Sequence, residues 1–88
     1  MENELTLKNR DRLIQLGITI AACRKRRDMS QEELAEKAQI SRSFLSNIEA
    51  PNIPQAFSLE ILFNIADALG IDPADLLASA SYLENKLH

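Results

Sequence analysis

The stretch from Ser30 to Glu49, SQEELAEKAQISRSFLSNIE, constrains the fold more than any other part of the chain. Ser30 and Glu33 have the S-x-x-E spacing of a capping box, which predicts that a helix begins at Gln31. Apolar or small residues recur with helical spacing on both sides of residues 39–41, where their phase breaks and Ser41 can cap a second helix. Two short helices joined by a tight turn form a helix-turn-helix motif.

The remaining sequence predicts a small all-α domain. The chain has 88 residues, of which 45% are hydrophobic and 26% charged, as expected for one globular domain. The apolar spacing indicates a helix from about Asp11 to the basic cluster at residues 24–27, with Gly17 allowing a close helix contact. The sequence also predicts a helix over 59–69. Asp72-Pro73 begins a further helix that can continue to the end of the chain.

For the helix over 59–69, the spacing favours one inward row, made of Leu59, Leu62, Phe63, Ala66 and Leu69. The complete expectation is five helices in a compact domain over residues 11–78. Residues 1–10 are expected to form an N-terminal arm, and residues 79–88 a helical extension or tail.

The motif resembles the DNA-binding core of the lambda-repressor-like family, also called the Cro/C1 or XRE type. The resemblance covers roughly residues 16–78 and is most specific over residues 30–49. Gln39 stands where the family usually has glycine, and a left-handed residue there costs about 1 kcal/mol. Ala50-Pro51 replaces the common Arg-Gly or Asn-Gly after the second helix. The resemblance implies that the helix over 42–49 enters the major groove of DNA.

This recognition helix carries an acid-free polar face opposite its apolar one. Arginine commonly reads guanine, asparagine suits adenine and serine is permissive. An exposed helix face is often polar for no further reason, but beside this motif we interpret the face as base-reading. The predicted base-reading residues are Arg42, Ser43, Ser46 and Asn47.

Other roles follow from the resemblance. Gln31 is predicted to hold a backbone phosphate at a helix N-terminus. Arg24 is predicted to form a structural ion pair with Glu49. The full set of predicted phosphate contacts is Ser30, Gln31, Arg27 and Ser41.

The loop at residues 50–57 has no lysine or arginine, and the chain has a net charge of −3. We therefore expect affinity for DNA to depend on dimerisation, on Lys8, Arg10 and Arg12 of the arm, or on a partner protein. A stripe on the last helix continues past Leu76 and Ala80 and favours a homodimer. The residues expected in that interface are Tyr82, Leu83 and Leu87.

The predicted function is sequence-specific binding of double-stranded DNA by a small transcriptional regulator, a repressor acting on a palindromic operator. An antitoxin of a toxin–antitoxin pair is one alternative. A protein-interaction module that binds another regulator is the other, favoured by the acidic balance. Catalysis, a metal site and a cofactor are not expected, because the one histidine is His88 and Cys23 lies on an apolar face. No small-molecule ligand is evident from the sequence. Without a signal peptide or an apolar run long enough to span a membrane, we expect a cytoplasmic protein.

Overall fold

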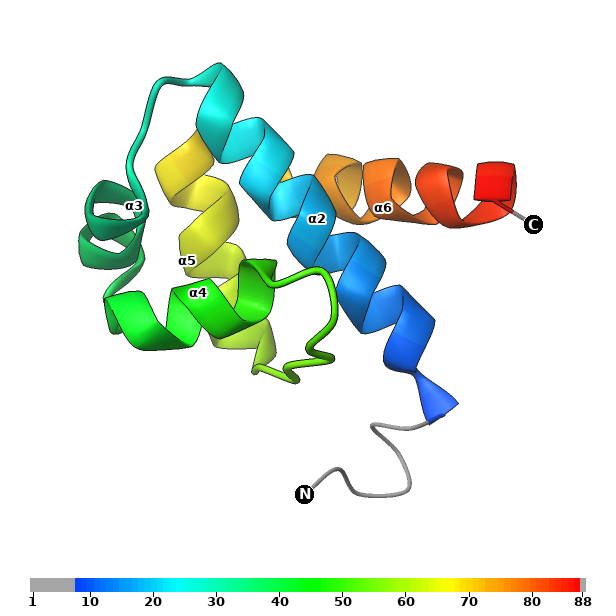
Figure 1. The fold of residues 1–88 in the computed structure, drawn as a ribbon. Coiled ribbons are helices and arrows are strands. Elements are labelled where there is room, and N and C mark those ends of the chain that lie inside the picture. The colour runs from blue at the N-terminus through cyan, green and yellow to red at the C-terminus, as the bar shows by residue number, and fades with distance from the viewer. Residues whose placement is uncertain (1–7, 88) are drawn as a thin grey trace.

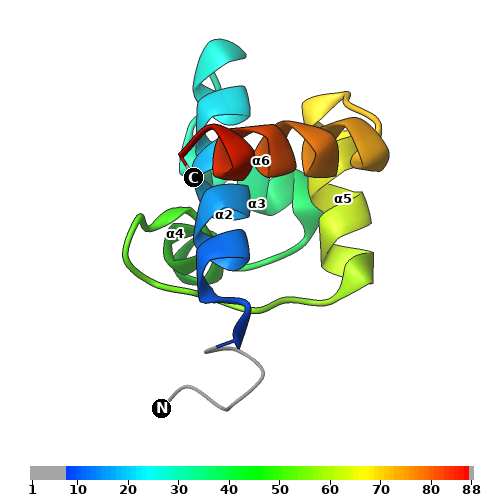
Figure 2. The ribbon, with the colours of Figure 1, turned by 90° about the vertical axis from the view of Figure 1, so that its right-hand side faces the viewer.

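The computed structural model describes the backbone of residues 8–87 and the side chains of residues 8–80. Its five helices confirm the predicted all-α fold, and residues 8–87 contain no strand. Figure 1 shows α2 running obliquely across the molecule, with α3 and α4 on one side of it and α6 on the other, and in Figure 2 α6 crosses in front of α2. The helices are α2 (Arg10–Arg26), α3 (Gln31–Ala38), α4 (Arg42–Glu49), α5 (Leu59–Leu69) and α6 (Pro73–Leu87).

Local side-chain caps set the starts of the helices where the sequence predicts them. The Oγ of Ser30 accepts a hydrogen bond from the Glu33 amide at 3.1 Å, and the Ser30 amide donates to Glu33 Oε1 at 3.2 Å. Ser41 and Ser58 accept from the third residue of α4 and of α5, at 3.0 and 3.2 Å. Each cap satisfies a backbone N–H that the first turn of a helix leaves without a partner.

The turn between α3 and α4 is closed by a left-handed residue. Gln39 has φ 61° and ψ 41°. The Ile40 amide then reaches back to the Ala35 carbonyl at 3.0 Å, and the side chain of Asn64 donates to the Ala38 carbonyl at 3.4 Å. The turn therefore has a left-handed geometry, which a glycine would adopt without strain.

The hydrophobic core lies among the five helices: α2 packs on α4 and α6, α3 packs on α4 and α5, and α5 packs on α6. Its fully buried side chains come from all five helices, among them Ile20, Leu34, Leu45, Ile65 and Leu76. No helix in the described part of the chain is both long and apolar enough to cross a membrane.

The prediction of the inward row of α5 was wrong in part. Leu59 is 65% exposed and Phe63 is 47% exposed, whereas Ile65 is completely buried. The helix is apolar on most of its circumference, so the spacing alone fits two rows equally well. The packing of α5 against α3 and α6 selects the row that contains Leu62, Ile65, Ala66 and Leu69.

Two further contacts fix how the long helices pack. Gly17 of α2 lies directly against the backbone of α4, and a Cβ atom built there would clash with the carbonyl oxygen of Ile48. On α6, Leu76 and Ala80 are buried in the core of the monomer. These two residues begin the stripe that the sequence assigns to a dimer interface, while the side chains of Tyr82, Leu83 and Leu87 lie outside the described residues.

Candidate nucleic-acid interface

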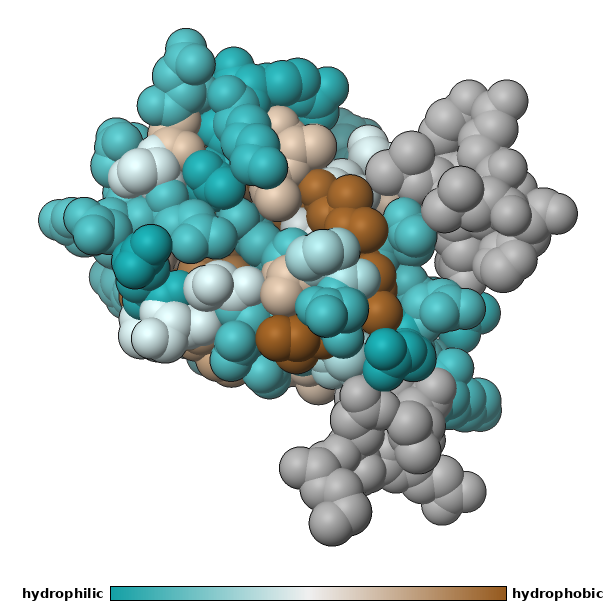
Figure 3. Space-filling model, in the orientation of Figure 1, coloured by the Kyte–Doolittle hydropathy of each residue, from teal (hydrophilic) through white to brown (hydrophobic). Residues whose placement is uncertain are grey.

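The helix α4 separates its side chains into a buried apolar face and an exposed polar one. Leu45 and Ile48 are 0% and 1% exposed and hold the helix against the core. The surface over the beginning of α4 is pale to teal in Figure 3, in agreement with its polar residues. The structure brings the four predicted base-reading side chains to this exposed face: Arg42, Ser43, Ser46 and Asn47.

The one acid of α4, Glu49, is withdrawn from this face and neutralised. Its carboxylate accepts from Arg24 Nε at 2.8 Å and from Arg24 Nη2 at 2.9 Å, so the predicted ion pair is confirmed. The side chains of Arg24 and Glu49 are 11% and 4% exposed. Arg24 also donates from Nη1 to the Met29 carbonyl at 2.7 Å. A two-point arginine–carboxylate contact of this kind fixes the relative orientation of α2 and α4.

Gln31 joins the same cluster, a contact that the sequence alone does not predict. Its Nε2 donates to Glu49 Oε1 at 3.0 Å, and the side chain is half-buried. We call Arg24, Gln31 and Glu49 the polar cluster. It ties the end of α2, the start of α3 and the end of α4 together. One N–H and the carbonyl oxygen of the Gln31 amide are left for another partner.

The remaining predicted phosphate contacts lie in different surroundings. Ser30 and Ser41 are exposed at the N-termini of α3 and α4, where each Oγ already accepts from the backbone and keeps its hydroxyl hydrogen to donate. Arg27 instead bridges the C-terminal ends of α2 and α5: its Nε donates to the Leu69 carbonyl and its Nη1 to the Cys23 carbonyl at 3.0 Å. These bonds within the molecule occupy part of its guanidinium, so its phosphate contact stays a prediction.

The loop that follows α4 is uncharged and held by its own backbone. The amides of Ile53 and Gln55 donate to the carbonyls of Ala50 and Ile53 at 3.4 and 3.0 Å. Pro54 is buried, while Ile53 is 39% exposed. Beside DNA this loop offers amide and apolar groups but no positive charge.

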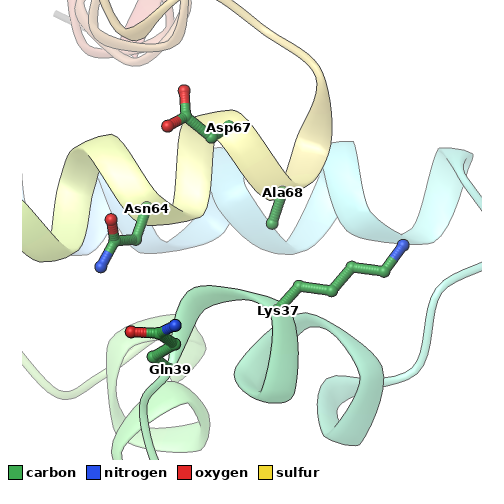
Figure 4. Close-up of a pocket in the computed structure, with 5 residues that line it drawn as sticks. All are labelled: Lys37, Gln39, Asn64, Asp67 and Ala68. Carbon is green, nitrogen blue, oxygen red and sulfur yellow. The ribbon is translucent and has the colours of Figure 1, made fainter.

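A shallow hollow of about 420 Å³ lies between α3 and α5 (Figure 4). Its walls present an amine, a carboxylate, two amides and a methyl group. Among the described residues, no group of histidine, cysteine, aspartate or glutamate side chains could hold a metal ion. The lining residues are Lys37, Gln39, Asn64, Asp67 and Ala68.

Comparisons with known proteins agree with this geometry. A family model described as Helix-turn-helix matches residues 20–76. The chain is similar to an immunity repressor protein of Bacillus phage phi105, with 37% identity over 71 residues, which are 81% of this chain and 48% of that protein. It therefore spans about half the length of this curated relative. Among solved structures it is similar to the clp gene regulator ClgR from C. glutamicum, with a TM-score of 0.70, 31% identity, and coverage of 81% of this chain and 88% of that one.

Proposed function

We propose, because this chain belongs to the helix-turn-helix family, that it binds double-stranded DNA sequence-specifically and represses transcription. The observation that carries the proposal is the exposed face of α4, which has no free acid because Glu49 is paired with Arg24. The names of its relatives, an immunity repressor and a gene regulator, support it further. We place this activity in the cytoplasm and assign the chain no catalytic role.

In this proposal α4 lies in the major groove and reads base edges. Arg42, in the first turn, presents the forked donors that suit guanine O6 and N7, and Asn47 suits adenine N6 and N7. Ser43 and Ser46 accept or donate as the neighbouring base requires. The absence of an acid from the first turn of α4 leaves the positive end of its helix dipole free to face DNA.

Phosphate contacts come from the two helix N-termini beside this face. Ser30 and Ser41 donate hydroxyl hydrogens, and Gln31 donates the amide N–H that Glu49 does not use. The bond to Glu49 orients the Gln31 amide before DNA arrives, which reduces the entropy lost on binding. Because Arg24 neutralises Glu49, a phosphate beside Gln31 meets little repulsion. Arg27 contributes through the guanidinium hydrogens left by its bonds within the molecule.

The active species in this proposal is a homodimer on a palindromic operator. A single domain with net charge −3 and an uncharged loop after α4 has few cations to exchange for the counterions of DNA. Two copies bound together double the contacts between protein and DNA. An operator with two-fold symmetry matches the two-fold symmetry of such a dimer. The tail residues Tyr82, Leu83 and Leu87 are proposed to contribute to the dimer.

The test compares two substitutions on DNA selected from a random pool. Arg42→Ala should lower discrimination at one base pair by about 1–3 kcal/mol, because a bidentate guanine contact is lost. Gln31→Ala should weaken selected and altered sites alike and leave the salt dependence nearly unchanged, because the amide is uncharged. Affinities are measured by fluorescence anisotropy across all single-base variants of the site. Arg26→Ala, which removes an exposed cation from α2, is the control and should leave the base-by-base profile unchanged.

Two outcomes would overturn the proposal. If Arg42→Ala weakens binding to every site variant equally, Arg42 contacts phosphate and α4 does not read bases as proposed. If the parent protein binds no duplex DNA even at low salt, the chain is better explained as a protein-interaction module.

A further inference from the structure

A second apolar row runs along α2, on the side that faces away from the core. The inward row contains Leu16, Ile20 and Cys23, all buried. Ile14 and Ile18 lie on the opposite side, partly exposed, and belong neither to the core nor to the apolar side chains packed against it. Figure 3 shows an apolar surface over the middle of α2.

The outward row has an unusual order of residues. Its members are separated by three, four, four and three positions, so that they form one continuous stripe on the helix. In chain order the side chains are an acid, two isoleucines, an alanine and a base. Their spacing is symmetric about Ile18. The row consists of Asp11, Ile14, Ile18, Ala22 and Lys25.

We propose that the outward row of α2 is the contact between two copies of this chain, packed antiparallel across a two-fold axis at Ile18. The inference rests on the proposed homodimer and names the surface that the dimer uses. In this register Asp11 of one copy faces Lys25 of the other, because each lies seven residues from Ile18. Ile14 likewise faces Ala22, each four residues from Ile18, so a large side chain meets a small one twice. An isologous contact repeats both pairings.

The charge of the molecule favours this surface for self-association. Two copies that each carry −3 repel one another, so a stable contact needs a face that is neutral or self-complementary. The outward row is apolar in its centre and pairs opposite charges at its ends. The exposed apolar pair on α5, Leu59 and Phe63, lacks this property, because the only charges of α5 are the acids Glu60 and Asp67.

The contact also leaves the candidate DNA-reading face uncovered. The side chains proposed to read bases all belong to α4, and none of them lies on the outward row. Gly17, between the two isoleucines in sequence, holds α2 against the backbone of α4 at Ile48. Because α2 is held closely against α4, a second copy bound on α2 would keep a fixed orientation relative to the recognition helix.

A disulfide formed across the axis tests the proposal. In Ile18→Cys the two new thiols face each other, and mild oxidation should convert most of the protein into a covalent dimer, since antiparallel packing brings the Cβ atoms within bonding range. Leu77→Cys places a thiol at an equally apolar, 44% exposed position on α6 and should remain monomeric on a denaturing gel. The native Cys23 is buried and does not compete. If Ile18→Cys yields no more covalent dimer than Leu77→Cys, the proposal is overturned.

A charge exchange provides a second measurement in the full chain. Asp11→Lys and Lys25→Asp should each weaken the dimer by about two- to thirtyfold, since two exposed ion pairs become repulsive. The double variant should restore the parent's dimerisation in sedimentation equilibrium, although both new charges oppose the helix dipole. A double variant weaker than either single one would contradict the antiparallel register.

Binding to a duplex carrying one half-site separates this proposal from the proposed function. Ile18→Asp should abolish the dimer and keep half-site affinity. If it remains as dimeric as the parent, the outward row is not the contact. If the parent protein binds no DNA, the DNA-binding function is refuted. The oxidation experiment on Ile18→Cys would then still decide whether the dimer uses the outward row.

Discussion

At the scale of single residues, Glu49 is the point where α2, α3 and α4 are joined, through Arg24 and Gln31. We expect Glu49→Ala to lower the free energy of unfolding by about 3 kcal/mol, because the buried guanidinium loses its counter-charge. Chemical denaturation measures this change. Glu60→Ala removes an exposed acid from α5 and should remain within about 0.5 kcal/mol of the parent. Coincident curves for Glu49→Ala and the parent would show that the ion pair adds no stability.

Gln39 closes the turn between α3 and α4 in a strained backbone conformation. With φ at 61° it occupies the left-handed region, which disfavours any residue with a Cβ atom. Gln39→Gly should therefore raise the free energy of unfolding by about 1 kcal/mol. Gln39→Ala keeps the Cβ atom and should leave stability close to that of the parent. A glycine variant less stable than the parent would mean that the glutamine side chain contributes more than the strain costs.

At the scale of the helices, the sequence is sufficient wherever the signal is local. The capping serines at positions 30, 41 and 58 act within three residues of themselves, so the starts of α3, α4 and α5 could be predicted. The inward face of α5 could not, because Leu59 and Phe63 fit a helical row as well as Ile65 does. Only the packing partners of α5 distinguish the two rows.

At the candidate site, too, some features could be predicted from the sequence and others could not. The exposed face of α4 could be predicted from its amphipathic spacing, and the Arg24–Glu49 pair from a family resemblance. The bonds from Gln31 to Glu49 and from Arg27 to Leu69 span 18 and 42 residues, and nothing local in the sequence encodes them. The outward row of α2 was missed because the helix carries two apolar rows and the inward one explained its spacing.

At the scale of the whole molecule, α6 continues to Leu87, beyond its last described side chain, Ala80. If the tail helps to hold two copies together, a chain that ends at Ala80 should show a smaller fraction of dimer in sedimentation equilibrium than the full chain. Its affinity for a half-site should be unchanged, because α4 is untouched. The full-length double variant Leu83→Ser and Leu87→Ser should reproduce the effect without shortening the helix. Equal dimer fractions for the truncated and full chains would assign the dimer entirely to other surfaces.

The close approach of Gly17 to Ile48 has a consequence for how such a regulator can diverge. The position of α4 is set there by main-chain atoms, which do not change when side chains are exchanged. If α4 reads bases as proposed, new residues at positions 42, 43, 46 and 47 can change which base sequence is preferred, while the helix keeps its place. An added methyl group at residue 17 would instead displace α4 itself, and in the proposed function it would weaken binding to every DNA site alike.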